Sequence, residues 1–229
     1  SSTAADTYSI AIQFGAILAV LLLYRIRVWS AMKGLVGADA DGRAFLIRLI
    51  VAFLPAAFLG VLAGDAMKSA LFGPVPVTIA WVVGGVFLLR WKPTVGSVSL
   101  HEMPIRAALI IGCAQSIALW PGVSRSLVTL VAALAVGLSM SSAIEFSFLL
   151  GLITLSSATA LDLTKHGSEL VDQFGILAPA IGLVCAFITA VIAVKWMVGY
   201  LESHSLRVFG WYRLAIGAVS VVLLATNVL

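Results

Sequence analysis

The chain has 229 residues, of which 62% are hydrophobic and only 10% are charged, and its formal net charge is +4. Since water-soluble domains carry about 25% charged residues, this composition excludes a soluble globular enzyme, and it also excludes a disordered chain or a disulfide scaffold. The apolar residues come in long blocks with the charges between them. The sequence therefore predicts an all-α, polytopic integral membrane protein.

Six stretches of the chain are apolar enough to predict membrane spans. In chain order they are residues 8–24, 49–63, 75–89, 144–161, 175–194 and 208–224. Basic residues follow the first, third and fifth spans, so the positive-inside rule places these connections, predicted as loops, in the cytoplasm. The predicted loops around Asp65 and Asp162 then lie outside, as does the N-terminus. Because the basic residues mark topology, nucleic acid is not an expected partner.

The segment between the third and fourth spans predicts a different element. Its two apolar stretches, residues 107–120 and 127–137, would reach roughly 21 and 17 Å as helices, whereas the hydrocarbon core is about 30 Å thick. The topology nevertheless requires an odd number of crossings between residues 106 and 162. We therefore predict a re-entrant helical hairpin whose tip holds Ser124, Arg125 and Ser126.

Short matches between the two halves of the chain predict an inverted repeat. Residues 11–14 resemble residues 143–146, residues 55–56 match residues 179–180, and residues 1–3 resemble residues 124–126. The matches keep the same order, and the second copy would enter the membrane from the opposite side. The expected organisation is a single membrane domain over residues 1–229. Its first repeat, residues 1–106, is N-terminally incomplete, and its second is residues 107–229.

The residues at the predicted tip favour an anion. Ser124 is placed to cap the second short helix, whose N-terminus would present backbone N–H groups and a positive dipole to a phosphate. Arg125 adds a planar cationic fork, and an arginine at membrane depth marks a ligand or a polar pathway. Ser126 and Thr129 are three residues apart and share a helical face. The structural alternative is that Ser124 only caps, that Ser126 and Thr129 bond within their own helix, and that Arg125 snorkels to an interface or pairs with a carboxylate such as Glu145.

Other residues predict structural roles. Ser142 and Glu145 have the spacing of a capping box at the start of the fourth span. Gln13, the counterpart of Glu145 in the repeat, is expected to make a buried polar contact between helices. Glycines at positions 84, 85, 210 and 217 are expected to allow close helix packing.

Several runs of residues together resemble one family. The run GCAQSIALWPGVSRS at residues 112–126, followed by EFSFLL at 145–150 and ALDL at 160–163, resembles the bacterial undecaprenyl-diphosphate phosphatase, or bacitracin-resistance, family. The likeness covers nearly the whole chain, including IQFG at residues 12–15 and the Tyr212-Arg213 pair.

The resemblance implies an activity and a setting. It implies hydrolysis of undecaprenyl diphosphate to undecaprenyl phosphate and inorganic phosphate, which recycles the lipid carrier of peptidoglycan synthesis. The family fold is an interdigitated inverted repeat in the bacterial inner membrane, with two re-entrant tips that meet in a cavity open to the periplasm. The implied partners are a polyprenyl diphosphate lipid and the bilayer. The oligomeric state, including a homodimer, stays open.

The resemblance also implies roles for individual residues. The family's second phosphate-binding motif falls on Ser124, Arg125, Ser126 and Thr129, and the end of its first motif falls on Ser1, Ser2 and Thr3. Carried over in this way, Arg125 and Ser2 are the catalytic candidates and the other five residues are phosphate-binding. Ser2 would be the nucleophile, with water as the alternative.

The chain departs from the family pattern in two places. The family carries a glutamate pair upstream of the first motif and a glycine-histidine after it, whereas here Thr3 is followed by Ala4-Ala5, so the native start of the chain is expected to be missing. The missing groups would supply acid/base chemistry and hold Mg²⁺ or another divalent cation, so no metal ligand is assigned. Leu127 stands where the family usually has glycine and would either narrow the phosphate loop or alter the approach of its backbone.

Two other functions remain open from the sequence. Inverted repeats with broken helices are also a transporter architecture, which is compatible with a lipid-phosphate flippase. The missing glutamates are compatible with a paralogue that binds phosphate without hydrolysing it.

Overall fold

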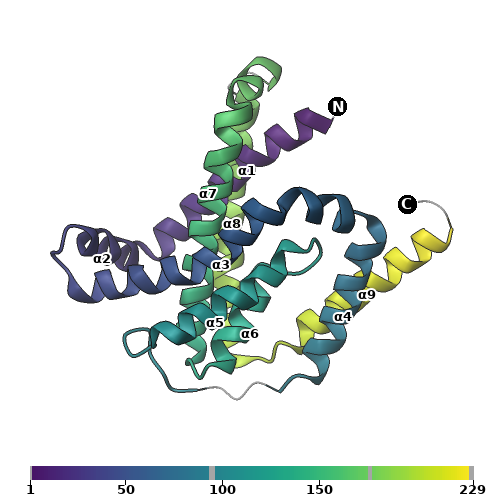
Figure 1. Cartoon of the computed structure of the whole chain (residues 1–229). Helices are drawn as coiled ribbons and strands as arrows, with labels where there is room; N and C mark the ends of the chain where they lie inside the picture. The colour runs from purple at the N-terminus through teal and green to yellow at the C-terminus, as the bar shows by residue number, and fades with distance from the viewer. Residues whose placement is uncertain (1, 93–95, 175–176, 227–229) are drawn as a thin grey trace. The chain divides into compact units, whose positions relative to one another are not determined.

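The computed structural model describes residues 2–92, 96–174 and 177–226. Within these ranges it does not describe the side chains of residues 2–11, 65, 68, 161–174 and 178. The helices, in chain order, are α1 (Ser2–Leu23), α2 (Arg25–Leu35), α3 (Ala40–Leu71), α4 (Pro74–Arg90), α5 (Ile105–Gln115), the 3-10 turn η1 (Ser116–Leu119), α6 (Arg125–Ala135), α7 (Met140–Phe174), α8 (Leu177–Ser203) and α9 (Arg207–Ala225) (Figure 1). The predicted all-α fold is confirmed.

Long apolar helices make the chain a polytopic membrane protein. Among the described residues, four stretches are long and apolar enough to cross a membrane: Ala40–Gly64, Met140–Ala160, Pro179–Ser203 and Arg207–Ala225. A fifth is counted if Ile12–Leu23 and Arg25–Leu35, which meet at an angle of 86°, form one bent span. The span predicted at residues 75–89 is helical, but α4 has only 17 residues and belongs with the shorter apolar helices.

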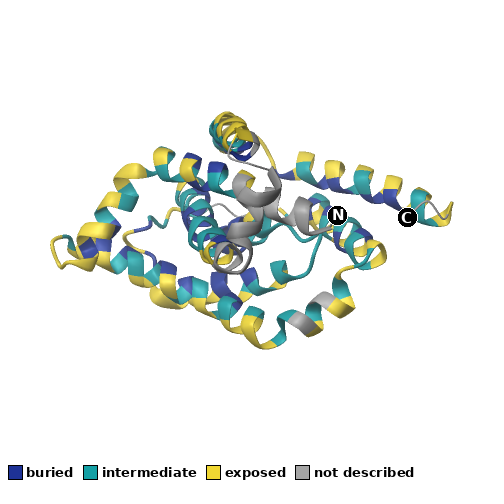
Figure 2. Cartoon of the chain, turned by 90° about the horizontal axis from the view of Figure 1, so that it is seen from above, coloured by how far each residue is buried: buried dark blue, intermediate teal, exposed yellow. Residues whose placement is uncertain are grey.

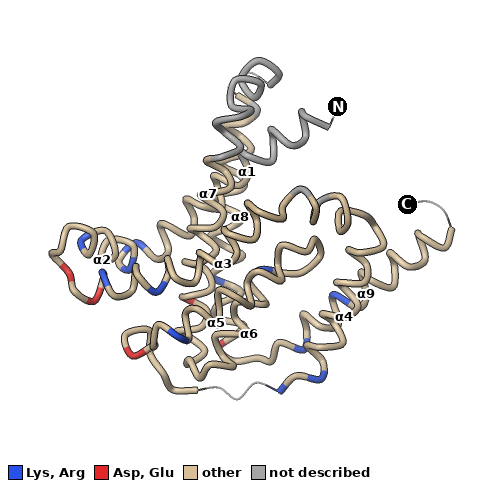
Figure 3. Tube along the Cα trace, viewed as in Figure 1, with Lys and Arg blue, Asp and Glu red and all other residues tan. Residues whose placement is uncertain are grey.

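Three segments predicted as loops are helical, so those predictions are wrong. The basic stretch after the first span forms α2, α3 continues past residue 65 to Leu71, and α7 continues past residue 162 to Phe174. Arg, Lys, Ala, Leu and Met favour helices, and helix α3 ends only where the Gly73-Pro74 pair follows. Figure 3 shows charged residues gathered around α2 and the start of α3.

The chain forms two compact units, and each is described by itself. The first comprises Ser1–Leu46 and Phe148–Tyr200. In it, Thr159 on α7 donates its hydroxyl hydrogen to Gln13 Oε1 on α1 over 2.9 Å, which confirms the predicted polar contact between helices, although Gln13 is half-buried and not buried. A Cβ added at Gly15 would lie 2.5 Å from the Leu183 carbonyl oxygen, so α1 and α8 approach closely there.

The second unit comprises Ile47–Ser147 and Leu201–Leu229. Its helices α4 and α9 pack through glycines: a Cβ at Gly85 would lie 3.0 Å from the Gly210 carbonyl oxygen, and one at Gly217 would lie 2.8 Å from Val82 Cγ2. The predicted role of these three glycines in close packing is confirmed. Figure 2 shows buried residues along one face of α9 and exposed residues along the other. The division into repeats at residue 106 stays a prediction, and both predicted halves contribute to each unit.

An isolated backbone bridge closes the segment that contains α5 and α6. Val98 N–H donates to the Gly137 carbonyl at 3.2 Å, and Ser139 N–H donates to the Val98 carbonyl at 3.0 Å. Helix α7 begins directly afterwards at Met140, and Ser139 Oγ accepts from the Ser142 N–H at 3.3 Å. The predicted capping box is therefore wrong, because Ser139 caps α7 and Ser142 already lies in its first turn.

Candidate phosphate site at the tip of the α5–α6 hairpin

Two short apolar helices meet at the predicted tip. Helix α5 continues into η1, residues 120–124 turn the chain, and α6 runs from Arg125 to Ala135. These helices match the two predicted stretches, residues 107–120 and 127–137, and both are too short to span a membrane. The hairpin is confirmed, whereas its re-entry into the membrane stays a prediction. Helix α5 packs closely on α3, since a Cβ at Gly112 would clash with the Ala52 carbonyl oxygen.

Ser124 caps α6, as predicted. Its backbone is extended (φ −77°, ψ 114°) and its Oγ accepts from the Leu127 N–H at 3.4 Å. The capped end directs the positive end of the helix dipole toward the tip. Leu127, where the resemblance predicts glycine, therefore donates the backbone N–H that the Ser124 cap accepts. Its effect on the width of the phosphate loop stays a prediction.

Arg125 is the first residue of α6 and is half-buried. In the part of the chain that the structure describes, no carboxylate and no carbonyl binds its guanidinium. Of the structural alternative, the ion pair between Arg125 and Glu145 is absent from the described residues, whereas the predicted bond of Thr129 within its own helix is present. Ser126, the next residue, is exposed. The tip therefore combines a helix N-terminus with an arginine whose donors are available to a ligand, which is a suitable arrangement for a phosphate group.

The Thr129 hydroxyl lies beneath the tip and not at its surface. The residue is 1% exposed, and its Oγ1 contacts the Arg125 carbonyl oxygen at 2.9 Å and Ser147 Oγ at 2.5 Å. Ser147 in turn donates to the Ser126 carbonyl at 3.0 Å. These bonds hold the first turn of α6 against α7. A direct bond from Thr129 to phosphate stays a prediction, and Ser147 is a contributor that sequence reasoning missed.

The turn itself rests on helix α4. Trp120 donates its Nε1–H to the Pro76 carbonyl at 3.2 Å. Gly122 has a φ of +89°, and a Cβ there would lie 2.8 Å from the Val77 carbonyl oxygen. Both the backbone conformation and the lack of space therefore require glycine at this position.

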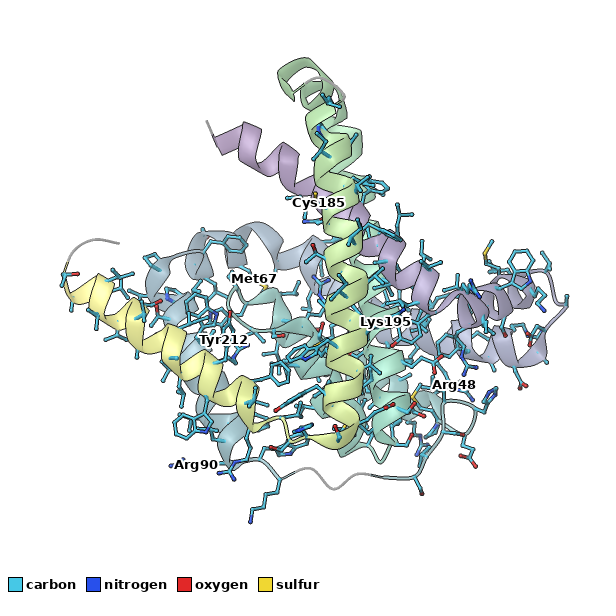
Figure 4. The ribbon with its side chains drawn as sticks, turned by 180° about the vertical axis from the view of Figure 1, so that it is seen from behind. Arg48, Met67, Arg90, Cys185, Lys195 and Tyr212 are labelled. Atoms are coloured by element: carbon cyan, nitrogen blue, oxygen red, sulfur yellow. The ribbon has the colours of Figure 1, made fainter. Side chains whose placement is uncertain are left out.

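Arg213 on α9 also holds the turn, and sequence reasoning assigned it no role. Its Nη2 donates to the Gly122 carbonyl at 2.5 Å and contacts the Ala80 carbonyl oxygen at 3.4 Å. Arg213 is only 8% exposed, whereas its neighbour Tyr212, labelled in Figure 4, is 64% exposed. The signal available in the sequence was a charged residue inside an apolar span, within the Tyr212-Arg213 pair of the resemblance.

The remaining predicted site residues cannot be placed at the tip. Ser1 lies outside the described residues, and so do the side chains of Ser2 and Thr3 in α1. Within the described part of the chain, no group of three or more His, Cys, Asp or Glu side chains could hold a metal ion. The described residues thus offer a candidate phosphate site, and they do not form a site for a metal held by protein ligands.

Fold and tip together define a polytopic α-helical membrane protein with a candidate anion site at a helix N-terminus. Residues 1–219 match the family model described as Bacitracin resistance protein BacA, and the chain belongs to this family. Among its relatives is an undecaprenyl-diphosphatase of Sorangium cellulosum, 42% identical over 225 residues, which are 95% of this chain and 73% of the relative. Proteins of the same name in Bradyrhizobium diazoefficiens and Acinetobacter baumannii are 41% and 38% identical, covering 96% and 93% of this chain and 83% and 79% of their own lengths.

Proposed function

We propose that this protein hydrolyses undecaprenyl diphosphate to undecaprenyl phosphate and inorganic phosphate, and so recycles the lipid carrier for peptidoglycan synthesis. The observation that carries the proposal is the capped N-terminus of α6, where the half-buried Arg125 has no carboxylate partner among the described residues. The relatives named undecaprenyl-diphosphatase support the choice of substrate.

The chemistry follows from the charges at the tip. Attack on the terminal phosphorus breaks its bond to the bridging oxygen, and the lipid monophosphate leaves. Negative charge is spread over the oxygens of the transferred phosphoryl group. A fixed cation and an oriented helix end stabilise that charge without reorganising during the reaction. The attacking oxygen comes from water directly, or from Ser2 with water releasing the phosphate in a second step.

The setting of the reaction belongs to the same proposal. The family resemblance supports a bacterial inner-membrane location with the tip facing the periplasm, and the basic residues support only which connections lie in the cytoplasm. The exposed apolar faces of the long helices would contact the lipid tail. Mg²⁺ or another divalent cation is proposed as cofactor from the family resemblance alone. No step is assigned to it, because the described residues do not form a protein site for it.

The test is release of inorganic phosphate from undecaprenyl diphosphate by the purified protein in detergent, with Mg²⁺ and with a chelator. Arg125→Ala is the variant, and Arg106→Ala is the matched control, since Arg106 is an exposed arginine on the other arm of the hairpin. We expect the first variant to lose phosphate release and the second to keep it. Equal activity in both would contradict the assignment of Arg125.

Two outcomes would favour the other functions. A wild-type protein that binds the lipid diphosphate but releases no phosphate would favour the non-hydrolysing paralogue. Movement of a lipid phosphate across vesicles containing the protein, without hydrolysis, would favour the flippase.

A further inference from the structure

Arg213 is a buried cation without an acidic partner. Its guanidinium binds carbonyl oxygens at Gly122 and Ala80, and no carboxylate pairs with it among the residues described. Its Nε is buried and has no acceptor in the described part of the chain. A charged group at such a place in a membrane helix costs about 2.5–3.5 kcal/mol on insertion scales, and such residues as a rule serve function. The contacts of Arg213 therefore need an explanation beyond packing.

We infer that Arg213 is a positioning residue for the phosphate site, acting through the Gly122 carbonyl. Gly122 lies two residues before Ser124, so any shift of Gly122 is passed on to the cap and to Arg125. The inference rests on the proposed function and deepens it. It assigns to helix α9, which carries no residue of the two phosphate-binding motifs, the task of fixing the α6 N-terminus against α4.

The neighbouring residues are arranged to keep Arg213 at this position. A Cβ at Gly84 would lie 3.0 Å from Arg213 Nε and 3.1 Å from Nη2, so the guanidinium occupies the space that a side chain at Gly84 would take. On the other side of the turn, Trp120 is bonded to the Pro76 carbonyl on the same helix. The turn is thus held on α4 in two ways. Trp120 binds the Pro76 carbonyl directly, and Arg213 on α9 links the Gly122 carbonyl to the Ala80 carbonyl.

The chemistry of the Gly122 carbonyl gives the contact a second effect. A carbonyl oxygen near an anion site repels the anion through its partial negative charge. A charge-assisted hydrogen bond from a guanidinium engages that oxygen and offsets its charge. Arg213 therefore both places the turn and makes its surroundings more favourable to a diphosphate, without contacting the substrate itself.

Three variants separate this role from general packing. Arg213→Met keeps an unbranched apolar stem in place of the arginine stem and removes the donors. Arg213→Lys keeps one cationic nitrogen, and one is enough because both hydrogen bonds leave from Nη2. Gly84→Ala retains Arg213 but displaces its guanidinium. The matched control is Gly217→Ala, which crowds the same α4–α9 pair at Val82 and leaves Arg213 untouched.

Activity is the first readout. We expect Arg213→Met and Gly84→Ala to lower kcat roughly 10- to 100-fold, the loss that about 1 Å of misplacement causes, with KM changed by less than about threefold. Arg213→Lys should recover most of the rate, and Gly217→Ala should resemble wild type. A loss in Gly217→Ala as large as that in Gly84→Ala would overturn the inference, as would full activity in Arg213→Met.

Hydrogen exchange of the backbone amides in residues 120–127 is the second readout, and it does not depend on catalysis. Faster exchange there in Arg213→Met and Gly84→Ala, but not in Gly217→Ala, supports the positioning role even if the wild-type protein releases no phosphate. In that case the proposed function fails and the inference about the turn survives. Unchanged exchange in Arg213→Met would overturn the inference whatever the activity.

A double-mutant comparison completes the test. If Arg213 acts by placing Arg125, then Arg125→Ala should cost much less in the Arg213→Met background than in wild type. Fully additive losses would show that the two arginines act independently, which would contradict a role exerted through the turn.

Discussion

Replacing Gly122 by alanine tests how strictly the turn must keep its geometry. The left-handed backbone at φ +89° costs a non-glycine residue about 1–2 kcal/mol. The added Cβ would also lie 2.8 Å from the Val77 carbonyl oxygen and 3.1 Å from Ala80 Cβ. Backbone on helix α4 cannot yield easily, so the turn must move by several tenths of an ångström at least. Shifts approaching 1 Å lower rates by about 100-fold, so we expect a fall in kcat of roughly 10- to 100-fold.

Gly37→Ala is the control for the cost of the left-handed backbone conformation alone, without a steric clash. Gly37 has a φ of +78°, but nothing lies within 4 Å of a Cβ added there. It should therefore lose about the same 1–2 kcal/mol of stability and keep its activity. Phosphate release and thermal unfolding of both variants, measured in one detergent, separate the two effects. Wild-type activity in Gly122→Ala, or equal activity losses in both variants, would refute the idea that contact with α4 sets the position of the turn.

Three further predictions concern other parts of the protein. Ser147→Ala should lower stability by about 1–3 kcal/mol because it removes two hydrogen bonds, to the Thr129 hydroxyl and to the Ser126 carbonyl, each worth about 0.5–1.5 kcal/mol, and thermal unfolding should show the loss while Arg106→Ala stays at wild type. Asp39 has a lowered pKa because the Gly42 backbone N–H and then the Ser30 hydroxyl bind its carboxylate. Its contribution to stability is thus present above the ordinary carboxyl pKa and is lost as the pH falls through the lowered value, so wild type and Asp39→Asn should converge in acid, and a constant difference would contradict this. Gly112→Ala should impair folding because its Cβ would clash with α3, which a loss of monodisperse protein on gel filtration would reveal.

Features set by local sequence could be predicted. The lengths of the two apolar stretches predicted the hairpin, and the Ser124 cap follows from residue types that favour helix N-termini. The close packing at Gly85 and Gly210 follows from small residues inside apolar helices. Each of these predictions depends on neighbours within a few positions, or on a preference that holds in many proteins.

Features set by tertiary contacts could not be predicted. The bond from Arg213 to Gly122 joins residues 91 positions apart, and no spacing rule connects them. The Thr129 hydroxyl was predicted to face a ligand because it shares a helical face with Ser126. In the structure Thr129 is buried and its hydroxyl contacts Ser147 on α7, a contact that no local spacing predicts, and its bond to a phosphate stays a prediction. Helix α2 was not predicted because the spans were identified from hydropathy, and hydropathy does not distinguish a polar helix from a loop.

The bridge between Val98 and Leu138 gives the hairpin a property that bears on how the family can vary. The backbone bonds of this bridge join the two ends of the segment between Val98 and Leu138, so that segment forms a closed loop that contains α5 and α6. Residues can be gained or lost in the connection between Arg90 and Val98 without changing the path that leads to Ser124 and Arg125. Differences in length among relatives should therefore gather in that connection, while the number of residues inside the closed segment stays constant.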